Sequence, residues 1–283
     1  ASAETDDECH AVADEIRAGK IQKTLFRLRN LKRGIDARIT PTGQTALHLA
    51  CAVGNVKLMS VLLKNGADPS LTDARGATCV ARACTEGHLD AVRRLYTDKR
   101  VDFNQPDDFG YCPVHRAIAG GHIDAAHFLL DKGVSADCKT VEAKPSADGI
   151  AAESRFEAPL HLAARTLGRE ERLVAKPPRY DAFELLLRYH ADPTLGDKNG
   201  DTFLHFVVRQ RDYTGIWLCF SLMGEVGPVM ATRNVRGRTL VEDADAVALG
   251  CGLVVRAAAA APPGVRERVA GFLLSDWMAC WNA

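Results

Sequence analysis

The chain has 283 residues, of which 47% are apolar and 25% charged, a balance that is normal for a soluble protein able to bury a core. Its 36 basic and 36 acidic residues cancel, and no long basic run occurs. Because duplex binding needs a strongly basic face, nucleic acid is excluded as an expected partner. The late apolar stretch at residues 253–261 is far shorter than the roughly 20 residues that cross a bilayer, so we expect no membrane insertion.

The nine cysteines are scattered, and none of them forms a Cys-x-x-Cys pair. Their spacing therefore signals neither a zinc knuckle nor a redox dithiol, and we expect no metal site and no cofactor. Several lie inside expected helices, where a free thiol serves as a small apolar filler. Residues 1–8 are acidic and lack the apolar core of a secretory signal. These features predict a cytoplasmic or nuclear protein.

One short pattern recurs along the chain. Its first copy is Thr-Ala-Leu-His-Leu-Ala at residues 45–50, and further copies are centred on His115, His161 and His205. The turn glycines Gly43, Gly76 and Gly110 give the period, since 76 − 43 = 33 and 110 − 76 = 34. A Thr-Pro-Leu-His pattern with a period of 33 residues is typical of ankyrin repeats. The chain resembles the ankyrin-repeat family over residues 9–250 approximately.

This resemblance implies an all-α solenoid of stacked helix-turn-helix units with short β-turn or hairpin loops and terminal capping helices. The units would form a curved array, and the hairpin tips and first helices would line a concave binding face. Repeat arrays also need capping units, because an end repeat has no neighbour to cover its outer side.

The pattern divides the chain into three regions. Residues 1–36 form an acidic N-terminus and a capping repeat, whose basic residues either make a solvated outer face or bind something acidic. Residues 37–249 form the array, with inserts near 140–156 and 166–179 that are either functional loops or linkers. Residues 250–283 form a degenerate repeat and a C-terminal capping helix.

Six of the nine histidines have an expected structural role. The resemblance implies that the histidine of each repeat motif hydrogen-bonds backbone and the motif threonine, while His88 and His122 begin second helices. We also expect the Thr45 hydroxyl to cap a helix and Gly66 to adopt a left-handed conformation. Asp107 and Asp108 fall on an exposed turn, and no phosphate-loop, dinucleotide or Gly-x-Ser-x-Gly motif occurs. We therefore expect a protein that is not an enzyme.

The expected binding residues lie at or beside the hairpin tips. Phe109 and Tyr111 are the leading candidates because exposed aromatic side chains on a rigid surface are typical interface anchors. Alternatively, Phe109 folds down onto the next repeat. Nearby arginines would bind an acidic or phosphorylated partner. The full expected set is Arg75, Arg82, Asp108, Phe109, Tyr111, Arg116, Lys198, Asp201, Arg236 and Arg238.

These features predict a non-catalytic adaptor or scaffold, monomeric in isolation, that binds a protein partner through its concave face. Two alternatives remain. The amphipathic C-terminal helix at residues 265–281 either caps the array or docks another subunit. The repeats could also target a separate enzyme whose catalytic centre lies elsewhere.

Overall fold

The computed structural model describes residues 3–31, 34–138, 140, 156–170, 181–210, 222, 228–229 and 232–237. The chain divides into two compact units, residues 1–154 and 155–283. None of the helices in the described ranges combines the length and apolar composition needed to cross a membrane. The predicted domain boundaries stay predictions. The aromatic helix expected near Trp217 and the C-terminal helix lie outside the described residues, as does nearly all of the insert at 140–156.

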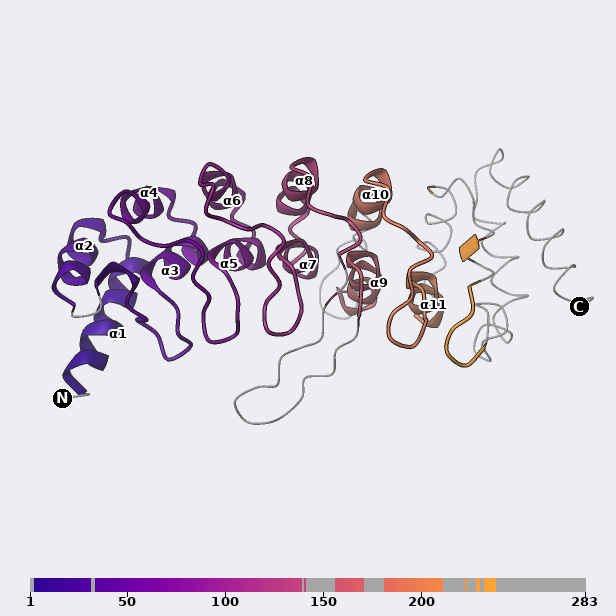
Figure 1. Cartoon of the computed structure of the whole chain (residues 1–283), viewed down its shortest axis with the longest axis horizontal. Coiled ribbons are helices and arrows are strands. Elements are labelled where there is room, and N and C mark those ends of the chain that lie inside the picture. The colour runs from indigo at the N-terminus through magenta and orange to yellow at the C-terminus, as the bar shows by residue number, and fades with distance from the viewer. Residues whose placement is uncertain are drawn as a thin grey trace, which may run out of the picture. The chain divides into compact units, whose positions relative to one another are not determined.

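The first unit is a stack of antiparallel helix pairs (Figure 1). Helices α3, α5 and α7 lie in one row, α4, α6 and α8 lie in a second row, and hairpin loops project beside the first. Helices α1 and α2 precede the stack, and α1 packs against α2 and α3. The helices are α1 (Ala3–Arg17), α2 (Ile21–Asn30), η1 (Gly34–Asp36), α3 (Ala46–Val53), α4 (Val56–Lys64), α5 (Cys79–Glu86), α6 (Leu89–Tyr96), α7 (Pro113–Ala119) and α8 (Ile123–Asp131).

Helix boundaries follow the capping residues. Thr45 is the N-cap of α3, and its hydroxyl oxygen accepts the N–H of His48. Gly54 ends α3 in the left-handed conformation, and Gly66, just after α4, has φ +90°. Glycine adopts this conformation without the strain that a Cβ would add. The predictions for Thr45 and Gly66 are confirmed.

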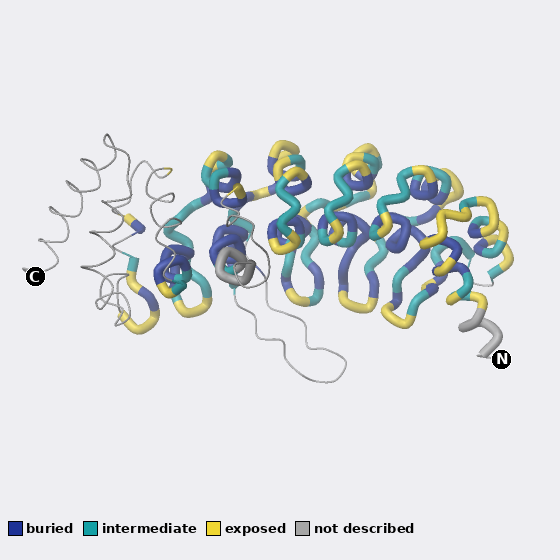
Figure 2. The backbone as a smooth tube through the Cα atoms, turned by 180° about the vertical axis from the view of Figure 1, so that it is seen from behind, coloured by how far each residue is buried: buried dark blue, intermediate teal, exposed yellow. Residues whose placement is uncertain are grey.

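Small side chains allow the first helices to approach closely. Ala50, Cys51, Cys79 and Ala83 are fully buried where α3 packs on α5. Larger side chains such as that of Leu62 fill the space behind them. Figure 2 shows the resulting pattern, with buried first helices and exposed hairpin tips. Burial of apolar surface in this stack is the main source of stability.

Histidines tie each repeat to a neighbour. His48 Nδ1 lies 2.9 Å from the Thr45 hydroxyl, and Nε2 lies 3.2 Å from the carbonyl oxygen of Ala77 in the next hairpin. In the Gly-His elements, His88 Nε2 lies 2.9 Å from the Ala52 carbonyl oxygen and His122 Nε2 lies 3.0 Å from that of Thr85. The predicted structural role of these histidines is confirmed.

Consecutive hairpin tips are hydrogen-bonded to each other. The N–H of Ala74 donates to the Thr42 carbonyl oxygen, and the N–H of Asp108 donates to that of Arg75, each at 2.9 Å. Gly76 makes the second contact possible, because a Cβ at this residue would lie 2.8 Å from the Asp108 nitrogen. The tips in this unit therefore form a connected row.

The second unit contains the same kinds of helix packing and histidine contact. Its helices are α9 (Pro159–Glu170), α10 (Asp181–Arg188) and α11 (Phe203–Arg209), with α9 packed on both others. His161 Nε2 lies 3.0 Å from the Asp201 carbonyl oxygen. Helix α9 continues to Glu170, so the expected insert at 166–179 begins inside a helix. Residues 171–180 lie outside the described residues.

We predict that Gly76→Ala destabilises the first unit more than Gly66→Ala. Both glycines have positive φ, so each substitution should cost about 1–2 kcal/mol of backbone strain. Only at Gly76 does the new Cβ also meet the next tip, which should add roughly 1–3 kcal/mol. Urea denaturation of both variants measures the difference, and equal losses would show that the tip contact does not need glycine.

We predict that His48 titrates below 6.5, because burial lowers the pKa of its imidazole. Since the depressed pKa favours the neutral ring in the folded state, this contribution to stability is complete above pH 6.5 and falls as the pH drops toward the folded-state pKa. An NMR titration of the His48 ring in the folded chain measures its pKa. A value at or above 6.5 would contradict the expected effect of burial.

Candidate functional site

A buried carboxylate organises each of two hairpins in the first unit. Asp107 Oδ1 accepts the N–H groups of Phe109 and Tyr111 at 3.0 and 2.9 Å. Its Oδ2 accepts from the Arg116 guanidinium, with Nε at 2.8 Å and Nη2 also in contact. Both carboxylate oxygens are thus used, one to shape the turn and the other to hold an arginine. The turn and the arginine are thereby fixed to each other.

Asp73 repeats this arrangement one hairpin earlier. Its Oδ1 accepts the N–H groups of Arg75 and Ala77, and its Oδ2 accepts Nε of Arg82 at 3.0 Å. Burial opposes the charged form of Asp73, but the hydrogen bonds from Arg82, Arg75 and Ala77 outweigh it and lower the pKa of the carboxyl. Arg82 is therefore held inside the repeat.

Two buried carboxylates of the second unit also bind arginine side chains. Glu157 binds Arg165 at 2.7 Å, and Asp201 Oδ2 binds Arg209 at the same distance. The expectation that Asp201 is an exposed binding residue is wrong, since it is 4% exposed and also accepts from Asn234. Its position just before Thr202 turns the carboxylate inward to these partners.

Phe109, Tyr111 and Arg116 form one cluster in the first unit. The Arg116 guanidinium lies 4.8 Å from the centre of the Tyr111 ring and 5.9 Å from that of Phe109. Phe109 is 41% exposed, and its ring lies beside the Arg116 guanidinium of its own repeat. Because Asp107 fixes the arginine, the aromatic rings rest against a positioned cation.

Arg75 extends this cluster across the neighbouring tip. Its carbonyl oxygen accepts the Asp108 N–H, which fixes the two tips side by side. Its side chain is exposed, and the structure gives it no ion-pair partner among the residues described. We name Arg75, Phe109, Tyr111 and Arg116 the tip patch.

The other predicted binding residues are distributed differently. Asp108 is half-buried, and its carboxylate occupies the space beside Gly76. In the second unit, Lys198 and Arg236 are exposed at hairpin tips. Arg238 lies outside the described residues. The structure thus groups Phe109, Tyr111 and Arg116 with Arg75 and leaves the other described residues of the set at separate exposed or internal positions.

The spacing of the cysteines along the chain did not predict a cluster of two thiols and one imidazole that lies beside the tip patch. Cys112, His115 and Cys138 place one ligating atom each within 4.8 Å of the others. Side-chain hydrogen bonding with Cys138, and to a lesser extent with His115, lowers the pKa of Cys112 to about 5 despite its burial. The same contact with Cys112 and burial raise the pKa of Cys138. Aligning the repeats, not scanning for local spacing, would have revealed this cluster.

A second group that the sequence missed joins the outer helices. Tyr96 packs against Phe103 and Phe128, with ring centres 5.6 Å apart in each pair. The Lys132 ammonium lies 5.5 Å from the Phe128 ring and 5.8 Å from that of Tyr96. Tyr96 and Phe128 both lie in the last turn of their helices, α6 and α8, and this was the available signal.

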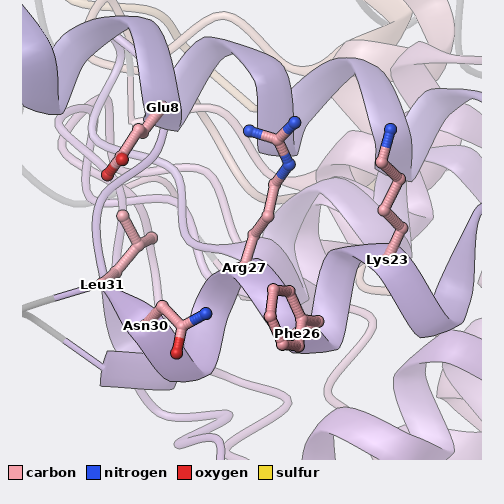
Figure 3. A pocket seen from close by; sticks show the side chains of 6 residues that line it. All are labelled: Glu8, Lys23, Phe26, Arg27, Asn30 and Leu31. Carbon is pink, nitrogen blue, oxygen red and sulfur yellow. The ribbon is translucent and has the colours of Figure 1, made fainter.

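A hollow of about 290 Å³ lies between helices α1 and α2 (Figure 3). Phe26 lines it and is 70% exposed. Lys23 and Arg27 also line it, but both bind the buried carboxylate of Glu15, at 3.5 and 2.9 Å. These contacts favour a structural role for the basic residues of the cap.

The stacked helix pairs, turn glycines and motif histidines define a helical repeat module. The family model for ankyrin repeats (3 copies) matches residues 17–107 and 54–142. The ankyrin repeat domain of Bcl-3 has a similar fold, with a TM-score of 0.65, 16% identity, and coverage of 82% of this chain and 92% of that one. Residues 17–142 therefore belong to the ankyrin-repeat family, and the chain has the fold of ankyrin-repeat domains. Such repeats are protein–protein interaction modules.

Curated relatives match part of this chain and part of their own length. Ankyrin repeat domain-containing protein 63 of Homo sapiens is 34% identical over 121 residues, which are 41% of this chain and 32% of that protein. The probable 26S proteasome regulatory subunit p28 of Saccharomyces cerevisiae is 32% identical over 113 residues, which are 40% of this chain and 49% of that protein. The chain thus spans less than half of either relative.

We predict that Asp107→Asn lowers the free energy of unfolding by about 1–2 kcal/mol, because the half-buried Arg116 loses its charged acceptor. The matched control is Asp90→Asn, which removes an exposed pair with Arg93 and should change stability by less than about 0.5 kcal/mol. Urea denaturation compares the two variants. Equal effects would show that the Asp107 pair contributes no more than a surface ion pair.

Proposed function

We propose that this chain is a non-catalytic adaptor that binds a protein partner through the tip patch. The observation that carries the proposal is the exposed Phe109 ring, held beside Tyr111 against a guanidinium that Asp107 fixes. A rigid aromatic side chain loses little conformational entropy on binding, so it is well suited to anchor an interface.

The charge of the tip patch defines the partner's chemistry. Asp107 already neutralises Arg116, whereas Arg75 extends from the adjacent tip without such a pair among the described residues. An acidic side chain could bind Arg75 by charge-assisted hydrogen bonds while an apolar side chain packs on Phe109. The partner segment would therefore carry Asp or Glu close to an aromatic or large aliphatic residue.

Exposed cations at other tips are secondary candidates for the same function. Lys198 and Arg236 in the second unit offer positive charge at exposed hairpin tips. Rim charges of this kind affect the association rate more than the affinity. We therefore assign the main contribution to the tip patch.

Selection from a phage-displayed library of random linear peptides tests the proposal. The full chain is the bait, and enriched peptides should combine an acidic residue with a nearby apolar one. Binding measured by fluorescence anisotropy should weaken at least about tenfold, or about 1.4 kcal/mol, in the double variant Phe109→Ala, Tyr111→Ala. Arg75→Ala should weaken binding and reduce its dependence on salt.

Two exposed residues outside the tip patch supply the controls. Phe26→Ala removes an exposed aromatic ring on α2, and Arg93→Ala removes an exposed arginine on α6. Both variants should retain wild-type affinity, and circular dichroism should show that every variant is folded. Enriched peptides that bind the double variant as tightly as the wild type would exclude the tip patch.

A regulatory subunit of a separate enzyme is the second candidate. It is supported by the yeast relative, whose name describes a proteasome regulatory subunit. In this case the tip patch would hold the enzyme or its substrate. Purification of the chain from cells should then recover an enzymatic activity that is lost with Phe109→Ala, Tyr111→Ala and kept with Phe26→Ala.

A further inference from the structure

Two thiols and one imidazole meet in the third repeat of the first unit. Cys112 and His115 are buried and Cys138 is half-buried. Cys138 Sγ lies 3.8 Å from His115 Nδ1, and one ligating atom of each residue lies within 4.8 Å of the other two. Cys112 and Cys138 precede α7 and follow α8, so the fold brings the sulfurs together. Neither cysteine forms a disulfide.

The first repeat provides an internal comparison for Cys112. Thr45 occupies the position of Cys112, three residues before the motif histidine in each case. The Thr45 hydroxyl lies 2.9 Å from Nδ1 of His48 and caps α3. Threonine also occupies this position before α5 and α11, where Thr78 and Thr202 are the N-cap residues. The third repeat therefore replaces a capping hydroxyl by a thiol.

The same comparison applies to Cys138. It follows the glycine after α8 at the spacing with which Leu71 follows the glycine after α4. The Leu71 backbone lies close enough to His48 to affect its pKa, so this position adjoins the motif histidine. In the third repeat a thiol replaces the leucine. Two separate departures from the chain's own repeat thus place sulfur beside one imidazole.

The imidazole presents a suitable donor atom. Nδ1 of His115 accepts the Cys112 N–H at 3.2 Å, so a neutral ring carries its proton on Nε2. Nδ1 therefore has the lone pair that a metal ion requires, at the cost of one long hydrogen bond. The nearby pair of Asp107 with Arg116 is already neutralised and adds little net charge.

We infer that Cys112, His115 and Cys138 form a Zn²⁺ site. Zinc prefers thiolate sulfur and imidazole nitrogen, with Zn–S about 2.3 Å and Zn–N about 2.0–2.1 Å. Tetrahedral geometry with these lengths places sulfur and nitrogen about 3.6 Å apart, close to the 3.8 Å between Cys138 Sγ and His115 Nδ1. Binding releases the remaining thiol protons and leaves two thiolates that balance the charge of the ion.

Three protein ligands come from the described residues, and the fourth position is open to water or to another donor. The half-buried Cys138 gives the ion a path from solvent. The Tyr111 ring packs on His115, with ring centres 5.8 Å apart, so zinc would brace the hairpin that carries the tip patch. The inference is independent of the proposed partner binding.

Titration of the reduced full chain with Co²⁺ and then Zn²⁺, without oxygen, tests the site. One equivalent of Co²⁺ should give an intense thiolate charge-transfer band that Zn²⁺ abolishes by displacement. Cys112→Thr and Cys138→Leu are the sharpest variants, because each restores the residue found in the first repeat. Both should remain folded and lose the band.

Cys9→Ser is the control, since Cys9 is half-buried like Cys138 but lies on α1. It should keep the band and the stoichiometry of the wild type. A rise in the wild-type melting temperature with Zn²⁺, absent in Cys138→Leu, would show that the ion binds the folded state. No stoichiometric band, a band that persists in Cys138→Leu, or equal loss in Cys9→Ser would overturn the inference.

Discussion

The hydrogen bonds of Asp107 connect the fold of the first unit to its surface chemistry. One carboxylate oxygen holds the turn N–H groups, which sets the positions of Phe109 and Tyr111. The other binds Arg116, against which both aromatic rings rest. A buried carboxylate with fewer donors would be costly, because burial disfavours its charge. The same interaction therefore stabilises the hairpin and positions the groups that a partner would meet.

The repeat pattern predicted much of the fold because its key interactions are local. Thr45 caps the helix that begins at the next residue, and Gly66 ends the helix pair within the same repeat. The His48 contact with Ala77 spans two repeats, yet it follows from the same pattern because every repeat places a hairpin beside the preceding motif. Local chemistry repeated at a fixed period is thus enough to define the stack.

The binding residues were harder to predict, because their roles depend on contacts within each hairpin. Arg82 and Arg116 share the position four residues after the helix cap, and both bind the carboxylate that starts their hairpin. Of these two arginines, only Arg116 has an exposed aromatic neighbour, Phe109. Asp201 was expected at the surface, but two partners hold its carboxylate inside. Position in the repeat predicted proximity to the hairpin, whereas side-chain pairing determined exposure.

The departures from the repeat pattern at Cys112 and Cys138 both fall in the third repeat. A repeat that served only as a spacer could keep threonine and leucine beside its histidine, as the first repeat does. Here the thiols of Cys112 and Cys138 occupy those positions, and the adjacent residues Tyr111 and Arg116 belong to the tip patch. Since Tyr111 contacts both Arg116 and His115, a change at the thiol cluster would act on the tip patch through direct packing. Coupling over so short a path requires no change in the stacking of the helices, because Tyr111 directly precedes Cys112 and His115 is next to Arg116 in α7.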